Sequence, residues 1–142
     1  MSNILTITNA DDRKACQMIH RYKSRLIRSK HPERHVIERI QFVDSPITNR
    51  TVAKIARQPF FQGTLKFLDL SRCFNICDGM IPGVPLPPMA PEEIGAMDNL
   101  HLIIGKLEQL EHLDLRGSQV SAYCIEKIKM ALPNCQVWFR NN

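Results

Sequence analysis

The sequence lacks any apolar run long enough to cross a membrane and any N-terminal segment of the secretory type. A membrane-spanning helix needs about 20 consecutive apolar residues, and polar or charged residues interrupt every apolar stretch well before that length. The first residues, Met1 to Ile7, have neither a basic start nor a long apolar segment. These absences predict a chain with no transmembrane segment and no secretory signal.

The cysteines are too few and too scattered to suggest a disulfide framework. Their number, five, is odd, which fits buried thiols in a reducing compartment better than paired disulfides. Cys73 and Cys77 could supply two zinc ligands, but no second pair follows at ligand spacing. His31 and His35 have helical spacing, yet Pro32 between them disrupts that geometry. We therefore expect no metal site and an intracellular location, in the cytoplasm, with mitochondria or delivery into a host cell left open.

Sequence motifs of catalysis are also missing. The chain has no G-x-S-x-G, no glycine-rich phosphate loop and no H-E-x-x-H. Asp69 and Asp114 occupy the same place in two related segments, and adjacent strands would bring them within about 5 Å of each other. Such a pair could serve as acid and base, but a column of solvated carboxylates is the commoner arrangement. We expect a protein without enzymatic activity, catalytic residues or cofactors.

The composition that is present is that of an ordinary globular domain. The 142 residues are 44% hydrophobic and 23% charged, which suits one core but is too short for two independent ones. The net charge of +5 is uneven, because residues 1–58 hold 12 Lys/Arg against 5 Asp/Glu. The remaining residues hold 7 Lys/Arg against 9 Asp/Glu, so the basic character belongs to the N-terminal part alone.

Most of these basic residues lie on a predicted helix. Residues 9–12 offer N-cap chemistry, and an apolar stripe follows at steps of three and four, comprising Ala15, Met18, Ile19, Tyr22 and Leu26. The cations on the other side are Arg13, Lys14, Arg21, Lys23, Arg25 and Arg28. They form a candidate surface for an acidic partner, either nucleic acid or anionic lipid, although Tyr22 is not free to stack on bases. A solvated helix face is the competing interpretation.

One phrase, L-x-x-L-D-L, is written twice, as residues 65–70 and 110–115. A weaker version at residues 37–42 keeps the apolar spacing with different residues. The fourth and sixth places of the phrase share one face of an extended strand, and the third and fifth share the other. A phrase that recurs after 28 and then 45 residues predicts stacked units that bury their apolar faces against one another.

The remaining segments extend this pattern in both directions. A strand over 4–8 precedes the basic helix, and Pro59 is expected to end a helix over 51–58. Five prolines between 79 and 91 predict an irregular insert, after which a helix resumes near Glu92 and continues to Leu107.

The fourth unit continues with a helix from Ser121, and an aromatic end strand at 137–139 is expected to cover the last core layer. We expect one domain, 1–142, made of a cap at 1–36, repeats at 37–64, 65–109 and 110–136, and a terminal strand at 137–142.

The doubled phrase resembles the leucine-rich repeat, which commonly has Asn or Cys just after the strand, and Cys73 fits that position. The equivalent positions Ser45 and Ser118 are small and polar instead. The spacing and the outer helix are most similar to the ribonuclease-inhibitor-like and cysteine-containing subclasses. The resemblance implies a short α/β solenoid with a parallel sheet on its concave side and helices on its convex side. The cysteine-containing subclass is familiar from substrate-recognition subunits of ubiquitin ligases, which gives an alternative function, although no F-box segment precedes the repeats. Small coupling-factor-like leucine-rich proteins of mitochondria are similar in size.

The function expected from this architecture is that of a protein-binding module or adaptor whose partner is another protein. Stacked strands present a broad and rigid surface, and Phe67 is the expected anchor because aromatic and Arg side chains dominate interfaces. The segment from Pro85 to Pro88 contains P-x-x-P and is a further candidate for the binding surface. The expected surface residues are Arg39, Gln41, Phe67, Asp69, Arg72, His112, Asp114 and Arg116.

Overall fold

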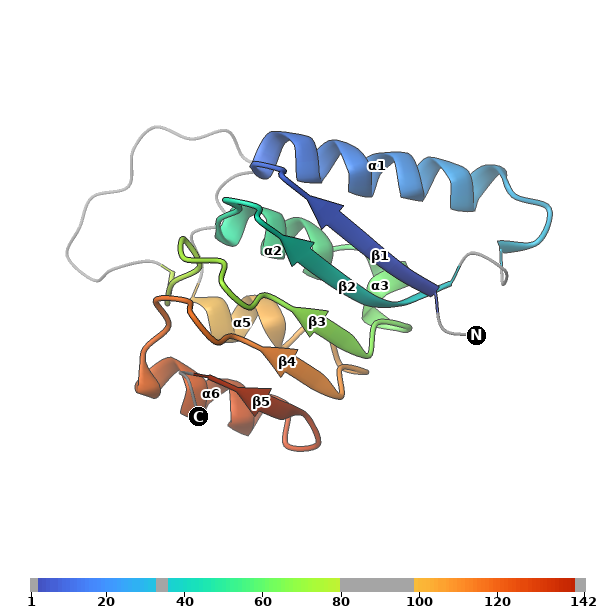
Figure 1. Ribbon diagram of the computed structural model, residues 1–142. Helices are drawn as coiled ribbons and strands as arrows, with labels where there is room; N and C mark the ends of the chain where they lie inside the picture. The colour runs from blue at the N-terminus through green and yellow to red at the C-terminus, as the bar shows by residue number, and fades with distance from the viewer. Residues whose placement is uncertain (1–2, 33–35, 80–98, 140–142) are drawn as a thin grey trace.

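The computed structural model describes residues 3–32, 36–79 and 99–139, which form a five-stranded parallel sheet alternating with helices (Figure 1). In chain order the elements are β1 (Asn3–Thr8), α1 (Asp12–Arg28), β2 (Ile37–Val43), α2 (Asn49–Ala56), α3 (Pro59–Gln62), β3 (Phe67–Asp69), α5 (Leu100–Ile104), β4 (His112–Asp114), α6 (Ala122–Ala131) and β5 (Gln136–Trp138). The strands lie in sequence order and every neighbouring pair is parallel. The predicted α/β class is confirmed.

The helices form one layer beside the sheet. Along the layer α1 contacts α2, α2 contacts α5, and α5 contacts α6, and Figure 1 shows them on the same side of the strands. Among the described residues no helix packs on the other side of the sheet, which we call the open face. A sheet covered on one face only should alternate buried and exposed side chains along each strand, and β2 does so from Ile40 to Val43.

The two copies of L-x-x-L-D-L lie side by side in register. Leu68 pairs with Leu113, and Asp69 pairs with Asp114. The degenerate copy aligns as the sequence predicts, because Ile40 of β2 pairs with Leu68 of β3. The strands themselves are short, three residues in each copy, while the outer leucines of the phrase lie just beyond the strand ends.

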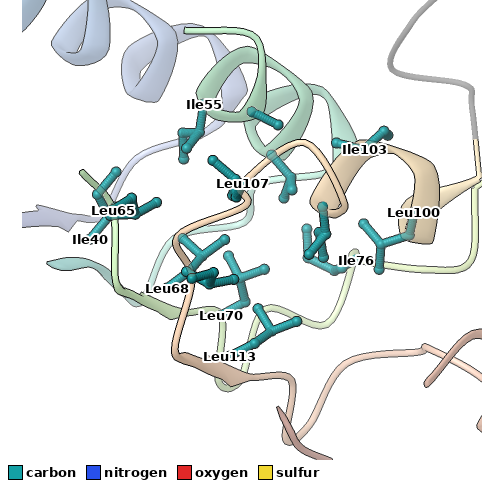
Figure 2. Close-up of a cluster of buried hydrophobic side chains, with 14 of the residues drawn as sticks. Ile40, Ile55, Leu65, Leu68, Leu70, Ile76, Leu100, Ile103, Leu107 and Leu113 are labelled. Carbon is teal, nitrogen blue, oxygen red and sulfur yellow. The ribbon is translucent and has the colours of Figure 1, made fainter. Parts of the chain in front are cut away.

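The core fills the space between the sheet and the helix layer. Ile40, Leu68 and Leu113 are completely buried and form one row across the sheet. Figure 2 shows these side chains packed with residues of α2 and α5. The first and last leucines of the phrase are buried as well, so each copy contributes three apolar side chains to the core. Burial at this scale, about 25 cal/mol for each Å² of apolar surface, is what holds such short strands in place.

Helix α1 begins and packs as its sequence predicts. Asp11 is the N-cap, and its carboxylate accepts a hydrogen bond of 2.9 Å from the Lys14 N–H. Ala15 and Ile19 are buried, and Tyr22 packs against the core from the same side. Ser121 caps α6 in the same way by accepting from the Cys124 N–H.

Two helix predictions were wrong at their ends. The second helix covers Asn49–Ala56, and Pro59 does not stop it but begins the separate short helix α3. Proline suits the first position of a helix, since its missing N–H would lack an intrahelical partner there. The helix predicted to reach Leu107 ends at Ile104, with Gly105 as its C-cap. Its start near Glu92, like most of the predicted insert 79–91, lies outside the described residues.

Four units share a left-handed residue after the strand. Asn9, Asp44, Arg72 and Gly117 all have positive φ, and the strand register places them at equivalent positions. We call them the turn column. The Asn9 N–H donates to the Val43 carbonyl at 3.0 Å, and the Arg72 N–H donates to the Arg116 carbonyl at 2.7 Å. The same backbone contact thus links the first unit to the second and the third to the fourth.

The turn column gives a prediction about stability. A Cβ at Gly117 would lie 3.2 Å from both the backbone nitrogen and the Cα of Arg72, in addition to the strain of a positive φ. Gly117→Ala should therefore lower the free energy of unfolding by about 2 kcal/mol. Arg72→Gly should raise it by up to about 1 kcal/mol, because arginine bears a left-handed strain that glycine does not.

Urea denaturation of the wild type and the two variants measures both changes. Gly63→Ala is the matched control, because Gly63 has a negative φ and a Cβ at this position would come no closer than 4.0 Å to its nearest neighbour. Equal effects of Gly63→Ala and Gly117→Ala would contradict the assignment of strain to the turn column.

Candidate functional site

The strand register arranges the open face into two rows of side chains. Alternate residues of a strand point to the same face, so each row takes one residue from each strand. The first row is Ile4, Arg39, Phe67, His112 and Gln136, and the second is Thr6, Gln41, Asp69, Asp114 and Trp138. Six of the eight residues predicted for the binding surface stand in these rows.

Three rings meet on the open face. The Phe67 ring lies 5.4 Å from the His112 ring and 6.0 Å from the Trp138 ring, and His112 lies 5.7 Å from Trp138. We call these three residues the ring cluster. All three are partly exposed, so the cluster offers both apolar area and polar ring edges to a partner.

Trp138 is the member of this cluster that was not predicted for the binding surface. The end strand was expected to cover the core, and Val137 and Phe139 do pack against it. Trp138 lies between them and therefore points to the opposite face, in register with Asp114. Strict alternation along Gln136–Trp138, with Val137 facing the core, is the sequence signal that could have predicted Trp138 on the open face.

An arginine stands at each end of the ring cluster. The Arg39 guanidinium lies 4.1 Å from the centre of the Phe67 ring, and that of Arg116 lies 5.8 Å from the Trp138 ring. Such cation–π contacts contribute about 0.5–1 kcal/mol when exposed and more when desolvated. The cluster and its two arginines thus form one continuous surface across β2 to β5.

The two aspartates of the repeated phrase do not form the solvated column that was expected. Asp114 is only 2% exposed, and its carboxylate accepts hydrogen bonds from the Arg116 guanidinium, with Nε 3.0 Å from Oδ1 and Nη2 2.7 Å from Oδ2. This contact also raises the pKa of Arg116 above its usual value, through the hydrogen bond and the negative charge of Asp114. Asp69 is half-buried, with its Oδ2 4.0 Å from Arg39 Nη2.

Both aspartates have the same structural contact. Asp69 accepts from the Ser71 N–H at 3.0 Å, and Asp114 accepts from the Arg116 N–H at 3.1 Å. A short acidic side chain that binds the backbone two residues onward stabilises a turn. The repeated Asp therefore holds the chain as it leaves each strand for the turn column.

A depression of about 850 Å³ lies at the carboxyl ends of β2, β3 and β4. Four residues predicted for the binding surface line it, namely Gln41, Asp69, Arg72 and Arg116. Phe74 also lines it and is 64% exposed, which is unusual for a large aromatic side chain. The structure thus places all eight predicted surface residues either in the two rows or along this depression beside them.

Two polar atoms on the open face have no hydrogen-bond partner within the described residues. They are Nε of Arg39 and Nδ1 of His112, and both are buried from solvent. Such atoms cost about 1–3 kcal/mol when left unpaired. Both atoms belong to residues that contact Phe67, so the surface formed by the ring cluster and its arginines contains two unsatisfied polar groups.

The predicted cations of α1 are all exposed. The helix itself lies along the outer edge of the molecule, away from the open face (Figure 1). In the part of the chain that the structure describes, no three His, Cys, Asp or Glu side chains gather as they would around a metal ion. Cys73 is buried, whereas His35 and the segment from Pro85 to Pro88 lie outside the described residues. No described helix has the length and apolar character needed to cross a membrane.

The described residues define an α/β protein whose parallel strands follow the order of the sequence, with no described helix on the open face of the sheet. No protein-family model matches the chain, and no curated protein matches it.

Proposed function

We propose that this chain is a leucine-rich-repeat-type protein-binding module without enzymatic activity, and that its partner is another protein bound on the open face. The observation that carries the proposal is the ring cluster with Arg39 and Arg116 at its ends. Partly exposed aromatic and arginine side chains in one continuous patch are the composition of interface hot spots. A soluble sheet without a partner would be expected to present smaller polar side chains there.

The repeat interpretation is supported by features beyond the doubled phrase. The strands follow one another in order, the inward leucines stack in rows, and the turn column recurs in four units. An architecture of this kind gives each unit's outward side chains a fixed spacing of about 4.8 Å from the next. The proposed surface is therefore preorganised, which lowers the entropy lost on binding.

The test is affinity capture from native cells with the tagged chain and its variants. Phe67→Ala and Trp138→Ala should each reduce recovery of the specific partner at least about 10-fold, because each removes a ring from the centre of the patch. Arg116→Ala should also weaken binding, since it removes the cation beside Trp138.

Tyr123→Ala and Met130→Ala provide the matched control. Both residues are large and exposed, at 69% and 73%, but they lie on α6 rather than on the open face. The partner should be retained by these two variants and then measured as a purified protein. If Phe67→Ala and Trp138→Ala remain folded by circular dichroism and still bind it with unchanged affinity, the open face is not the binding surface.

A further inference from the structure

Helix α1 carries an unusual excess of positive charge. From Arg13 to Lys30 the sequence contains seven Lys/Arg and no Asp/Glu, and all seven side chains are exposed. No described carboxylate forms an ion pair with any of them. An exposed helix usually interleaves both signs of charge, and the described residues provide no such compensation for these cations.

The cations form a continuous band along the helix. Arg21, Arg25 and Arg28 follow one another at steps of four and three residues, so they lie on one side over about 10 Å. Together with His20, Ser24 and Ser29 they line a shallow depression of about 510 Å³. Arg21 also lines a second depression of about 800 Å³, with Arg13 and Lys14. The band therefore reaches from the first turn of α1 to the last.

Electrostatic interactions within the helix do not explain the whole band of cations. Arg25 and Arg28 lie in the last turn, where the helix dipole favours cations. Arg13 and Lys14 lie in the first turn, where the same dipole disfavours them. Arg21 and Arg25 are four residues apart, and like charges at that spacing destabilise a helix. An anionic surface outside the protein would compensate these charges.

Three further observations favour one kind of anionic surface over the other. Ile27 precedes Arg28 in the last turn of α1 and is 72% exposed, and an aliphatic side chain gains from a lipid headgroup region but not from a phosphate backbone. Tyr22, the only Phe, Tyr or Trp of α1, is stacked on Phe61 with 5.7 Å between ring centroids, so it cannot stack on a base. The helix also lies along the outer edge of the molecule (Figure 1), where a flat surface can approach it.

We propose that α1 docks the protein on an anionic membrane surface through its band of cations, with Ile27 entering the headgroup region. The apolar stripe of the helix, including Ala15 and Ile19, is buried in the protein core. The helix therefore rests on the membrane and does not insert by that stripe. This surface is separate from the open face, so membrane docking would leave the ring cluster accessible to a partner.

Co-sedimentation of the full chain with vesicles tests the proposal. Binding is expected to vesicles of two parts phosphatidylcholine to one part phosphatidylserine, and not to phosphatidylcholine alone. Each cation near such a surface strengthens binding about five-fold, so Arg21→Gln, Arg25→Gln and Arg28→Gln combined should weaken it on the order of 100-fold. Ile27→Ser should weaken it by a smaller factor, and moderate salt should release the protein.

The control variant removes the same charge elsewhere. Lys66→Gln, Lys106→Gln and Lys127→Gln combined lower the net charge equally but leave α1 intact, and binding should fall by only a few-fold. Equal losses in the two triple variants, or equal binding to both kinds of vesicle, would overturn the proposal. Tighter binding of the wild type to a short RNA duplex or to single-stranded RNA than to the anionic vesicles would overturn it as well. Circular dichroism establishes that every variant is folded.

Discussion

Replacing Phe61 with alanine should lower the free energy of unfolding by about 4 kcal/mol, the usual loss for a fully buried phenylalanine. Phe61 has no exposed surface. Its ring stacks on Tyr22 of α1 at 5.7 Å and meets the edge of Phe60 at 4.5 Å. Truncation would remove the contact through which α3 holds α1 and leave a cavity that the surrounding short elements cannot easily fill.

The neighbouring Phe60 is the control for this prediction. It belongs to the same four-residue helix and touches the same Tyr22 ring at 5.7 Å, but its side chain is partly exposed. Phe60→Ala should therefore lower the free energy of unfolding by only about 1–2 kcal/mol. Urea titrations followed by circular dichroism measure both values. A loss for Phe61→Ala no larger than that for Phe60→Ala would show that the aromatic contacts do not hold α1 in place.

The strands were predicted correctly from the sequence, whereas a helix boundary close to Phe60 and Phe61 was not. The repeated phrase correctly predicted the neighbouring strands and their register. Side chains alternate between the two faces of a strand, so Leu68 and Leu113 enter the same core only when the two strands are in register. Pro59 was wrongly predicted to end a helix. A proline stops a helix that approaches it from the N-terminal side but equally begins a new one, and the local sequence does not decide between these outcomes.

The candidate site was predictable in its positions but not in its contacts. Alternation along the strands is enough to place Arg39, Phe67 and His112 on one face. The burial of Asp114 depends on Arg116 folding back two residues to bind its carboxylate, and the place of Trp138 depends on the register of an end strand. Both are consequences of tertiary packing, which composition and spacing do not determine.

The turn column was missed for a related reason. Asn9, Asp44 and Gly117 are residue types that tolerate a positive φ, but each is also common in ordinary loops. Arg72 carries no such signal, and only the backbone reveals that it occupies the same position. Its φ of 62° is one that arginine rarely adopts, at a position that lines the depression at the strand ends.

Raising the pH from 8 to 10 should lower the free energy of unfolding by about 3 kcal/mol through three buried thiols. Burial raises the pKa of Cys73 to about 12, with a smaller contribution from the charge of Asp69, and raises the pKa of Cys124 and Cys135 to about 11. An unfolded thiol has a pKa near 9.0. The folded state therefore holds its protons above pH 9, where the unfolded chain releases them, and stability is lost from pH 9 until the thiols ionise in the folded state near pH 11–12.

The contribution of these thiols can be isolated by comparison with a double variant, Cys124→Ala with Cys135→Ala. Solvent screening reduces the contribution of each thiol at pH 10 to about 1 kcal/mol, so the double variant should lose about 2 kcal/mol less than the wild type. Burial also raises the pKa of Tyr22, but this residue is present in both proteins and cancels in the difference. Urea titrations at pH 8 and pH 10 under reducing conditions give the change in the free energy of unfolding with pH for each protein. Equal losses in the wild type and the double variant would contradict the inference, because they would mean that the buried thiols ionise as readily in the folded chain as in the unfolded one.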